Sequence, residues 1–194
     1  EWHRSCAVVL RMTPVSGVRR SPVASYLDGL HERFRELDDG EVATYIPELS
    51  KADPRWFGIC IATVDGHVYE IGDARQPFTI QSISKPFVYG LALEDRGKPA
   101  VLERIGVEPT GDAFNEISLE AATGRPRNPM INAGAIAASS LVAGHSAEDQ
   151  WERILGLFAL YTGRRVELDE AVYRSERDTG HRNRAISHML RNFG

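Results

Sequence analysis

The chain has 194 residues, of which 42% are hydrophobic and 26% charged, a composition typical of globular rather than disordered proteins. Its net charge of −4 includes no long basic stripe, so we expect no nucleic-acid partner and take a small molecule as the expected ligand. No apolar stretch approaches the roughly 20 residues that span a bilayer, so we expect no membrane partner.

Two of the residues are cysteines, and they lie far apart in the sequence. Neither a disulfide framework nor a C-x-x-C metal site is therefore expected, which fits a reducing cytoplasm. Cys60 lies in an apolar run, where a thiol usually packs as a small core residue. Residues 1–20 are expected to form a flexible N-terminal tail, and residues 21–194 a single domain, since no linker or repeat divides them.

The first half of the chain predicts two helices and a hairpin. The segment 21–40 has helical apolar spacing, opened by a Ser-Pro pair and closed by a glycine. Residues 56–64 and 67–71 are typical of strands joined by an Asp-Gly turn, which predicts a β-hairpin. An apolar helix then begins near Ser82 and ends at Gly97.

The second half is predicted to be mainly helical. A short helix over 101–105 precedes a loop rich in proline, glycine, aspartate and asparagine. The segment 130–142 predicts a helix whose alanines and glycine indicate close packing. A Ser-x-x-Asp pattern resembling a capping box opens the helix predicted over 146–163. Residues 169–176 and 182–190 are also expected to be helical.

Lys85 is one of only three lysines in a chain that otherwise uses arginine, and it follows Ser82 by three residues. Positions i and i+3 of a helix face the same side with their Cβ atoms about 5–6 Å apart, so the two side chains can meet. A desolvated lysine, unlike arginine, can lose its proton and act as a base. Ser82 is thus a candidate nucleophile and Lys85 its base. The alternative is a serine N-cap followed by a surface lysine, which this pattern alone does not exclude.

Four motifs in one order resemble the serine-dependent glutaminase family, and the similarity covers roughly residues 22–194. The motifs are Tyr45-Ile46-Pro47-Glu48-Leu49, Gln81-Ser82-Ile83-Ser84-Lys85-Pro86-Phe87, Asn128-Pro129-Met130-Ile131-Asn132-Ala133-Gly134-Ala135-Ile136, and Ser175-Glu176 with Arg182-Asn183. The resemblance implies an α+β fold like that of serine β-lactamases and penicillin-binding proteins. It also implies that the domain over 21–194 is a glutaminase domain.

The same resemblance implies hydrolysis of L-glutamine to L-glutamate and ammonia through an acyl-enzyme. Ser82 would attack the side-chain carboxamide, while Lys85 would take its proton and later protonate the departing nitrogen. Tyr45 matches a family tyrosine near the nucleophile, where a phenol can relay protons or hold the carboxamide. Tyr45 could instead be a packing aromatic at a chain turn.

Substrate binding is implied for Ser82 and three further residues. Glu176 would pair with the α-ammonium group, and Asn132 and Asn183 would supply amide donors and acceptors. The alternatives are an interhelical hydrogen bond for Asn132 and solvated helix-surface positions for Glu176 and Asn183.

No metal or other cofactor is expected. His181 and His188 are seven residues apart and lack a third ligand, so they are interpreted as solvated or capping side chains. We further expect a homo-oligomer in the cytoplasm.

Members of the family continue beyond the position matching Gly194, so we expect a domain that is truncated at its C-terminal end. Such a chain should be poorly active, and the apolar face of the Ser82 helix should lack part of its cover. Two alternatives stay open. One is a catalytically impaired remnant that binds a ligand or a partner chain, and the other is a serine acyl enzyme acting on β-lactams or esters.

Overall fold

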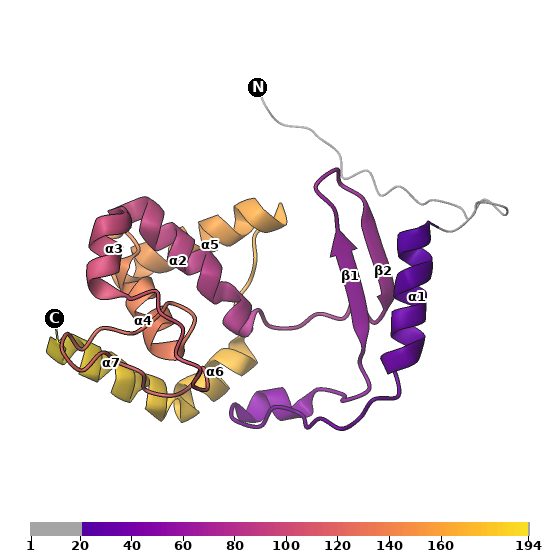
Figure 1. Cartoon of the computed structure of the whole chain (residues 1–194), viewed down its shortest axis with the longest axis horizontal. Helices are drawn as coiled ribbons and strands as arrows, with labels where there is room; N and C mark the ends of the chain where they lie inside the picture. Colours follow the sequence, from indigo (N-terminus) through magenta and orange to yellow (C-terminus); the bar gives the residue numbers. More distant parts are fainter. Residues whose placement is uncertain (1–20, 194) are drawn as a thin grey trace. The chain divides into compact units, whose positions relative to one another are not determined.

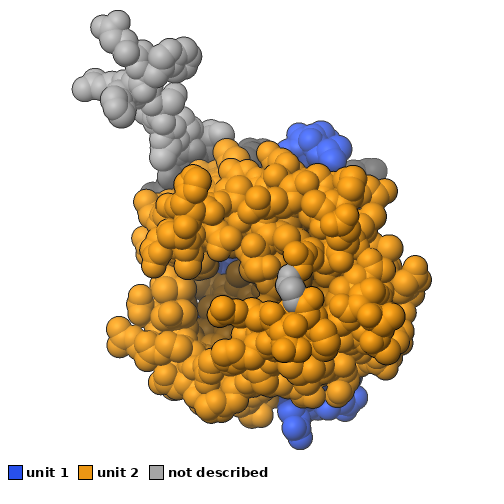
Figure 2. Space-filling model, turned by 90° about the vertical axis from the view of Figure 1, so that its left-hand side faces the viewer, with its two compact units in different colours: residues 1–41, 53–76 blue, residues 42–52, 77–194 orange. Residues whose placement is uncertain are grey.

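The computed structural model describes residues 21–193, so the tail expected over 1–20 lies outside the described residues. The described chain contains seven α-helices, two short 3-10 helices and one two-stranded sheet. It divides into two compact units, coloured separately in Figure 2. Unit 1 comprises residues 1–41 and 53–76, and unit 2 comprises residues 42–52 and 77–194.

Unit 1 places one helix, α1 (Pro22–Phe34), beside a hairpin, as Figure 1 shows. The Ser21 hydroxyl accepts a hydrogen bond from the Val23 N–H at 3.2 Å, which confirms the predicted N-cap. The helix ends at Phe34, earlier than the predicted end at residue 40. Residues 36–39 include three acidic side chains, which disfavour a helix C-terminus, and two of these are aspartates, which are also poor helix formers.

The predicted hairpin is confirmed as β1 (Gly58–Ala62) paired antiparallel with β2 (Val68–Gly72). The expectation that Cys60 packs in a core is wrong, because its thiol is exposed. Neighbouring residues of a strand point to opposite faces. The half-buried Ile59 lies on one face of the hairpin, whereas Cys60 and its cross-strand partner Glu70 lie exposed on the other.

Unit 2 holds the remaining helices, and the helices predicted from sequence are confirmed with shifts of a few residues at their ends. In chain order its elements are η1 (Pro47–Lys51), η2 (Gln81–Ile83), α2 (Ser84–Arg96), α3 (Lys98–Arg104), α4 (Asn132–Leu141), α5 (Ala147–Thr162), α6 (Glu170–Thr179) and α7 (His181–Phe193). The predicted capping box at Ser146 and Asp149 is present at the start of α5, and Gly163 ends that helix in the left-handed conformation.

The core of unit 2 lies around α2 and α4. Val88 and Leu91 pack with Val142 and Phe158, and Ala92 packs with residues of α3 and α4. These three side chains of α2 are 7%, 4% and 0% exposed, so the expectation of an uncovered apolar face is wrong for them. A third buried cluster joins α4 to α7 through Ile131, Ala133 and Ile186. The segment with the candidate nucleophile, Ser82, therefore leads directly into a well-packed helix.

No helix between residues 21 and 193 is both long and apolar enough to cross a membrane.

Candidate active site

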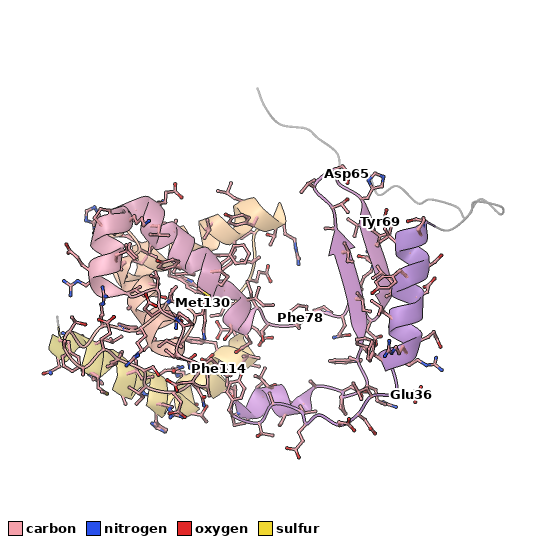
Figure 3. The ribbon with its side chains drawn as sticks, in the orientation of Figure 1. Glu36, Asp65, Tyr69, Phe78, Phe114 and Met130 are labelled. Carbon is pink, nitrogen blue, oxygen red and sulfur yellow. The ribbon has the colours of Figure 1, made fainter. Side chains whose placement is uncertain are left out.

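Lys85 is the second residue of α2 and is 8% exposed. Its Nζ donates hydrogen bonds of 2.9 Å to the Met130 carbonyl oxygen and of 2.9 Å to Asn132 Oδ1. Nζ also lies 5.2 Å from the centre of the Phe114 ring. Phe114 and Met130 are labelled in Figure 3. A surface lysine, the alternative left open by the sequence, does not describe this side chain.

The surroundings of Nζ disfavour its charged form. Burial lowers the pKa of the Lys85 amine from its ordinary value, since a desolvated ammonium loses hydration. Within residues 21–193 no carboxylate forms an ion pair with Lys85, and both hydrogen-bond partners are neutral acceptors. A neutral amine has two N–H donors and one lone pair. Two acceptors would occupy both donors and leave the lone pair available for a proton.

Ser82 lies in η2, one turn before Lys85, and its side chain is exposed. In the described part of the chain its hydroxyl forms no hydrogen bond with Lys85, whose two bonds go to α4 and the turn before it. The residue before it, Gln81, has a φ of +43°. The nucleophile candidate therefore follows an uncommon backbone conformation at the entrance to α2.

Asn132 links three helices. Its Oδ1 accepts from Lys85, its Nδ2 donates to Asn183 Oδ1 at 3.2 Å, and its backbone N–H donates to the Phe114 carbonyl oxygen at 2.9 Å. Each end of the amide thus has a partner that fixes its orientation. Lys85, Asn132 and Asn183 form one hydrogen-bonded row across α2, α4 and α7.

Glu176 and Tyr45 come from segments that are tied to each other. The Glu48 backbone N–H, just after Tyr45, donates to the Ser175 hydroxyl of α6 at 3.1 Å. Among the described residues the half-buried Glu176 carboxylate has no ion-pair partner, and Tyr45 is exposed with no hydrogen bond from its phenol. No hydrogen bond joins either side chain to the Lys85 row within residues 21–193.

Two contributors to the site were missed by sequence reasoning, the Met130 carbonyl and the Phe114 ring. The Met130 carbonyl could not be predicted, because every residue type carries the same backbone acceptor. Phe114 could have been noticed, because it is a lone aromatic residue in a polar loop. Between residues 21 and 193 no group of three or more His, Cys, Asp or Glu side chains is placed to hold a metal ion.

Comparison with known proteins gives matches along most of the chain. A family model described as glutaminase matches residues 40–194. The chain is 54% identical over 177 residues to a glutaminase of Trichormus variabilis, with 91% of this chain and 53% of the relative covered. It is 49% identical over 191 residues to glutaminase 2 of Bradyrhizobium diazoefficiens, with 95% of this chain and 30% of the relative covered. The chain thus spans about half, or less, of the length of these relatives.

Solved structures agree with these matches. Mglu in its glutamate form superposes with a TM-score of 0.84 at 46% identity, covering 91% of this chain and 41% of that chain. A probable glutaminase, ybaS, superposes with a TM-score of 0.85 at 39% identity, covering 91% and 58%. These neighbours have the β-lactamase-like α+β fold, so the predicted fold class is confirmed.

Proposed function

Because the chain belongs to the glutaminase family, we propose that it carries the nucleophile and base of an amidohydrolase that converts L-glutamine to L-glutamate and ammonia. The observation that supports this most directly is the state of Lys85. Its amine is buried, lacks a carboxylate partner among the described residues and lies one turn after an exposed serine. These are the conditions under which a lysine serves as a general base.

The first half-reaction follows from these groups. The Ser82 hydroxyl gives its proton to the Lys85 lone pair as Oγ bonds to the carboxamide carbon of glutamine. The Lys85 proton then passes to the amide nitrogen as the C–N bond breaks, so ammonia leaves and a γ-glutamyl ester remains on Ser82. Catalytic hydrogen bonds commonly tighten only in the substrate complex, which reconciles this step with the Lys85 contacts seen without substrate.

The second half-reaction restores the Ser82 hydroxyl with a proton supplied by water. Water gives a proton to Lys85 as its oxygen adds to the ester carbon, the bond to Ser82 Oγ breaks, and Oγ takes the proton back. Free L-glutamate leaves, and both side chains regain their starting forms.

Substrate recognition uses the remaining residues. The Glu176 carboxylate, which forms no ion pair within residues 21–193, suits the α-ammonium group of glutamine. Asn132 and Asn183 provide amide donors and acceptors beside Lys85, and the Tyr45 phenol can relay protons or hold the carboxamide. Charged recognition of the amino group would favour amino-acid substrates over simple amides.

We also propose a cytoplasmic homo-oligomer. The exposed thiol of Cys60 and the absence of a disulfide framework fit a reducing compartment. Large apolar side chains that lie exposed on α5, Leu160 and Tyr161, offer surface for a second copy. Light scattering of the purified protein at micromolar concentration tests the assembly, and a monomer under those conditions contradicts it.

A covalent-labelling experiment tests the chemistry. A diazo ketone analogue of glutamine should form an adduct on Ser82, located by mass spectrometry, and penicillin should form none. Ammonia release should fall about 10²–10⁴-fold in both Ser82→Ala and Lys85→Arg, because arginine keeps the charge but cannot act as the base. Lys98→Arg, at an exposed lysine of α3, is the matched control and should release ammonia as the wild type does.

Two results would overturn the proposal. One is an adduct with penicillin but none with the diazo ketone, which would indicate a different substrate class. The other is unchanged ammonia release in Lys85→Arg.

A further inference from the structure

The backbone just before the candidate nucleophile adopts an unfavourable conformation. Gln81 is the one non-glycine residue with positive φ between residues 21 and 193, at +43°. A non-glycine residue in the left-handed region is unfavourable, and it persists only where its surroundings hold it. Such a conformation beside a reactive group suggests that something nearby keeps it in place.

Hydrogen bonds from Ser84 stabilise the backbone conformation of Gln81. The Gln81 carbonyl oxygen accepts from the Ser84 hydroxyl at 2.7 Å and also from the Ser84 backbone N–H. The Gln81 side-chain amide is held as well, since its Nε2 donates to Thr79 Oγ1 at 3.2 Å. Ser84 is half-buried and is the first residue of α2, which is anchored in the core of unit 2. The strained peptide is thereby fastened to the helix that carries Lys85.

We propose that Ser84 is a positioning residue, whose hydroxyl holds the Gln81 carbonyl and so sets the direction of the Ser82 hydroxyl toward Lys85. The inference rests on the proposed function, because it assigns Ser84 a part in the same reaction. The Ser84 hydroxyl donates its proton in a hydrogen bond to the Gln81 carbonyl oxygen, so Lys85 and not Ser84 is the group that accepts the proton of Ser82. Small misplacements of reacting groups slow a reaction steeply, so loss of this bond should reduce turnover rather than substrate binding.

Kinetics of two variants test the role. Ser84→Ala should lower kcat for ammonia release about tenfold with KM changed less than about twofold, and Ser84→Thr, which keeps the hydroxyl, should recover most of the loss. The pH at which activity is half-maximal should stay the same in both, because Lys85 keeps its partners. Ser140→Ala is the matched control. The Ser140 hydroxyl makes the same kind of bond, to the carbonyl oxygen of Ala137 three residues earlier at 2.7 Å, on an exposed part of α4.

A structural measurement separates this inference from the proposed function. In crystals of Ser84→Ala the φ of Gln81 should leave the left-handed region, whereas Ser84→Thr should keep it. An unchanged φ in Ser84→Ala, or a shifted φ with kcat no lower than in Ser140→Ala, overturns the role of Ser84. A wild-type chain that neither releases ammonia nor forms the adduct on Ser82 contradicts the proposed function instead.

Discussion

The hydrogen-bond partners of the Lys85 amine are neutral. A buried ammonium group without a carboxylate is unfavourable, so burial lowers the pKa of this amine, while the Met130 carbonyl and the Asn132 amide still satisfy its N–H groups. An acidic partner in either place would have favoured the protonated form. The amine is thus held in place by neutral partners while its burial disfavours the charged form.

The activity should depend on pH through this amine. Because the base works in its neutral form, ammonia release should rise with pH through the pKa of Lys85, with a midpoint below the ordinary lysine value of 10.5. Initial rates between pH 6 and 10 measure the midpoint. Activity that keeps rising to the ordinary lysine value would contradict a desolvated base.

The lowered pKa of Lys85 should also make the free energy of unfolding depend on pH. The folded-state pKa of Lys85 lies below the unfolded-state value, so between the two values the unfolded chain binds more protons. The free energy of unfolding should therefore rise with pH across this interval in the wild type, relative to Lys85→Met. Urea unfolding at several pH values measures it. Lys98→Met, at an exposed position, should follow the wild type.

The sequence predicted part of this site. The i, i+3 spacing predicted that Ser82 and Lys85 can meet, but no hydrogen bond joins them within residues 21–193. The resemblance brought in Asn132 and Asn183, which do form a hydrogen-bonded row with Lys85. The partners of Nζ lie 45 and 47 residues further along the chain, so local sequence could not show whether they were neutral or acidic. Cys60 was misjudged for a related reason, since an apolar run does not tell which face of a strand a neighbouring helix covers.

At the scale of elements, a buried carboxylate adds a polar link between α2 and α5, whose apolar side chains also pack together. Asp95 has a side chain that is 3% exposed and accepts from Arg153 Nε through both oxygens, at 3.0 and 2.8 Å. Its Oδ2 also accepts from the Ala143 N–H at 2.7 Å. Hydrogen bonds from Arg153, followed by the bond from Ala143, hold the pKa of Asp95 below its ordinary value despite its burial.

Replacing this carboxylate should weaken unit 2. Asp95→Asn is expected to lower the free energy of unfolding by about 1–3 kcal/mol. A larger loss is not expected, because Arg153 is partly exposed and solvent screens its interaction with Asp95. The wild type should show the stabilisation above the ordinary carboxyl pKa and lose it as pH falls through the lowered folded-state value. Urea unfolding of both proteins at pH 7 and pH 3 tests this. Glu152→Gln, in an exposed pair with Arg165, should change stability by no more than about 0.5 kcal/mol.

The packing of α4 depends on a glycine. A Cβ at Gly134 would overlap the Asn128 carbonyl oxygen and lie 2.7 Å from Pro129 Cα. Gly134→Ala should therefore cost about 1–3 kcal/mol of stability, since backbone atoms must move. Gly156→Ala, in the middle of α5 with nothing within 4 Å, should instead stabilise by about 0.5–1 kcal/mol. Thermal unfolding of the two variants measures the change in stability of each. Equal changes in Gly134→Ala and Gly156→Ala would contradict the predicted clash at Gly134.

Elements were easier to predict from sequence than their contacts. The hairpin and the capping box of α5 were predicted because turn and cap residues act locally. The alanines and glycine of residues 130–142 predicted close packing, and Ala133, Gly134 and Ala138 are buried. Their neighbours could not be predicted, because periodicity identifies an apolar face without identifying what covers it.

At the scale of the whole molecule, all six candidate site residues fall in unit 2. A ligand that binds there should stabilise this unit by mass action. In Ser82→Ala, which removes the proposed nucleophile, L-glutamine at about 100 times its Kd should raise the free energy of unfolding by about 2.7 kcal/mol. Scanning calorimetry measures the shift. The double variant with Glu176→Gln at the same glutamine concentration should lose most of it, and an equal shift in both would argue against pairing of Glu176 with the ammonium group.

The amide of Asn132 leaves the site open to one form of chemical ageing. Asparagine side chains slowly hydrolyse to carboxylates, a change of one nitrogen for one oxygen. The new oxygen would replace Nδ2 and face Asn183 Oδ1, while the negative charge, shared with Oδ1, would turn the neutral contact with Lys85 Nζ into a salt bridge that favours the protonated amine. If Lys85 is the proposed base, deamidation of this one residue would therefore keep it protonated and unable to accept a proton.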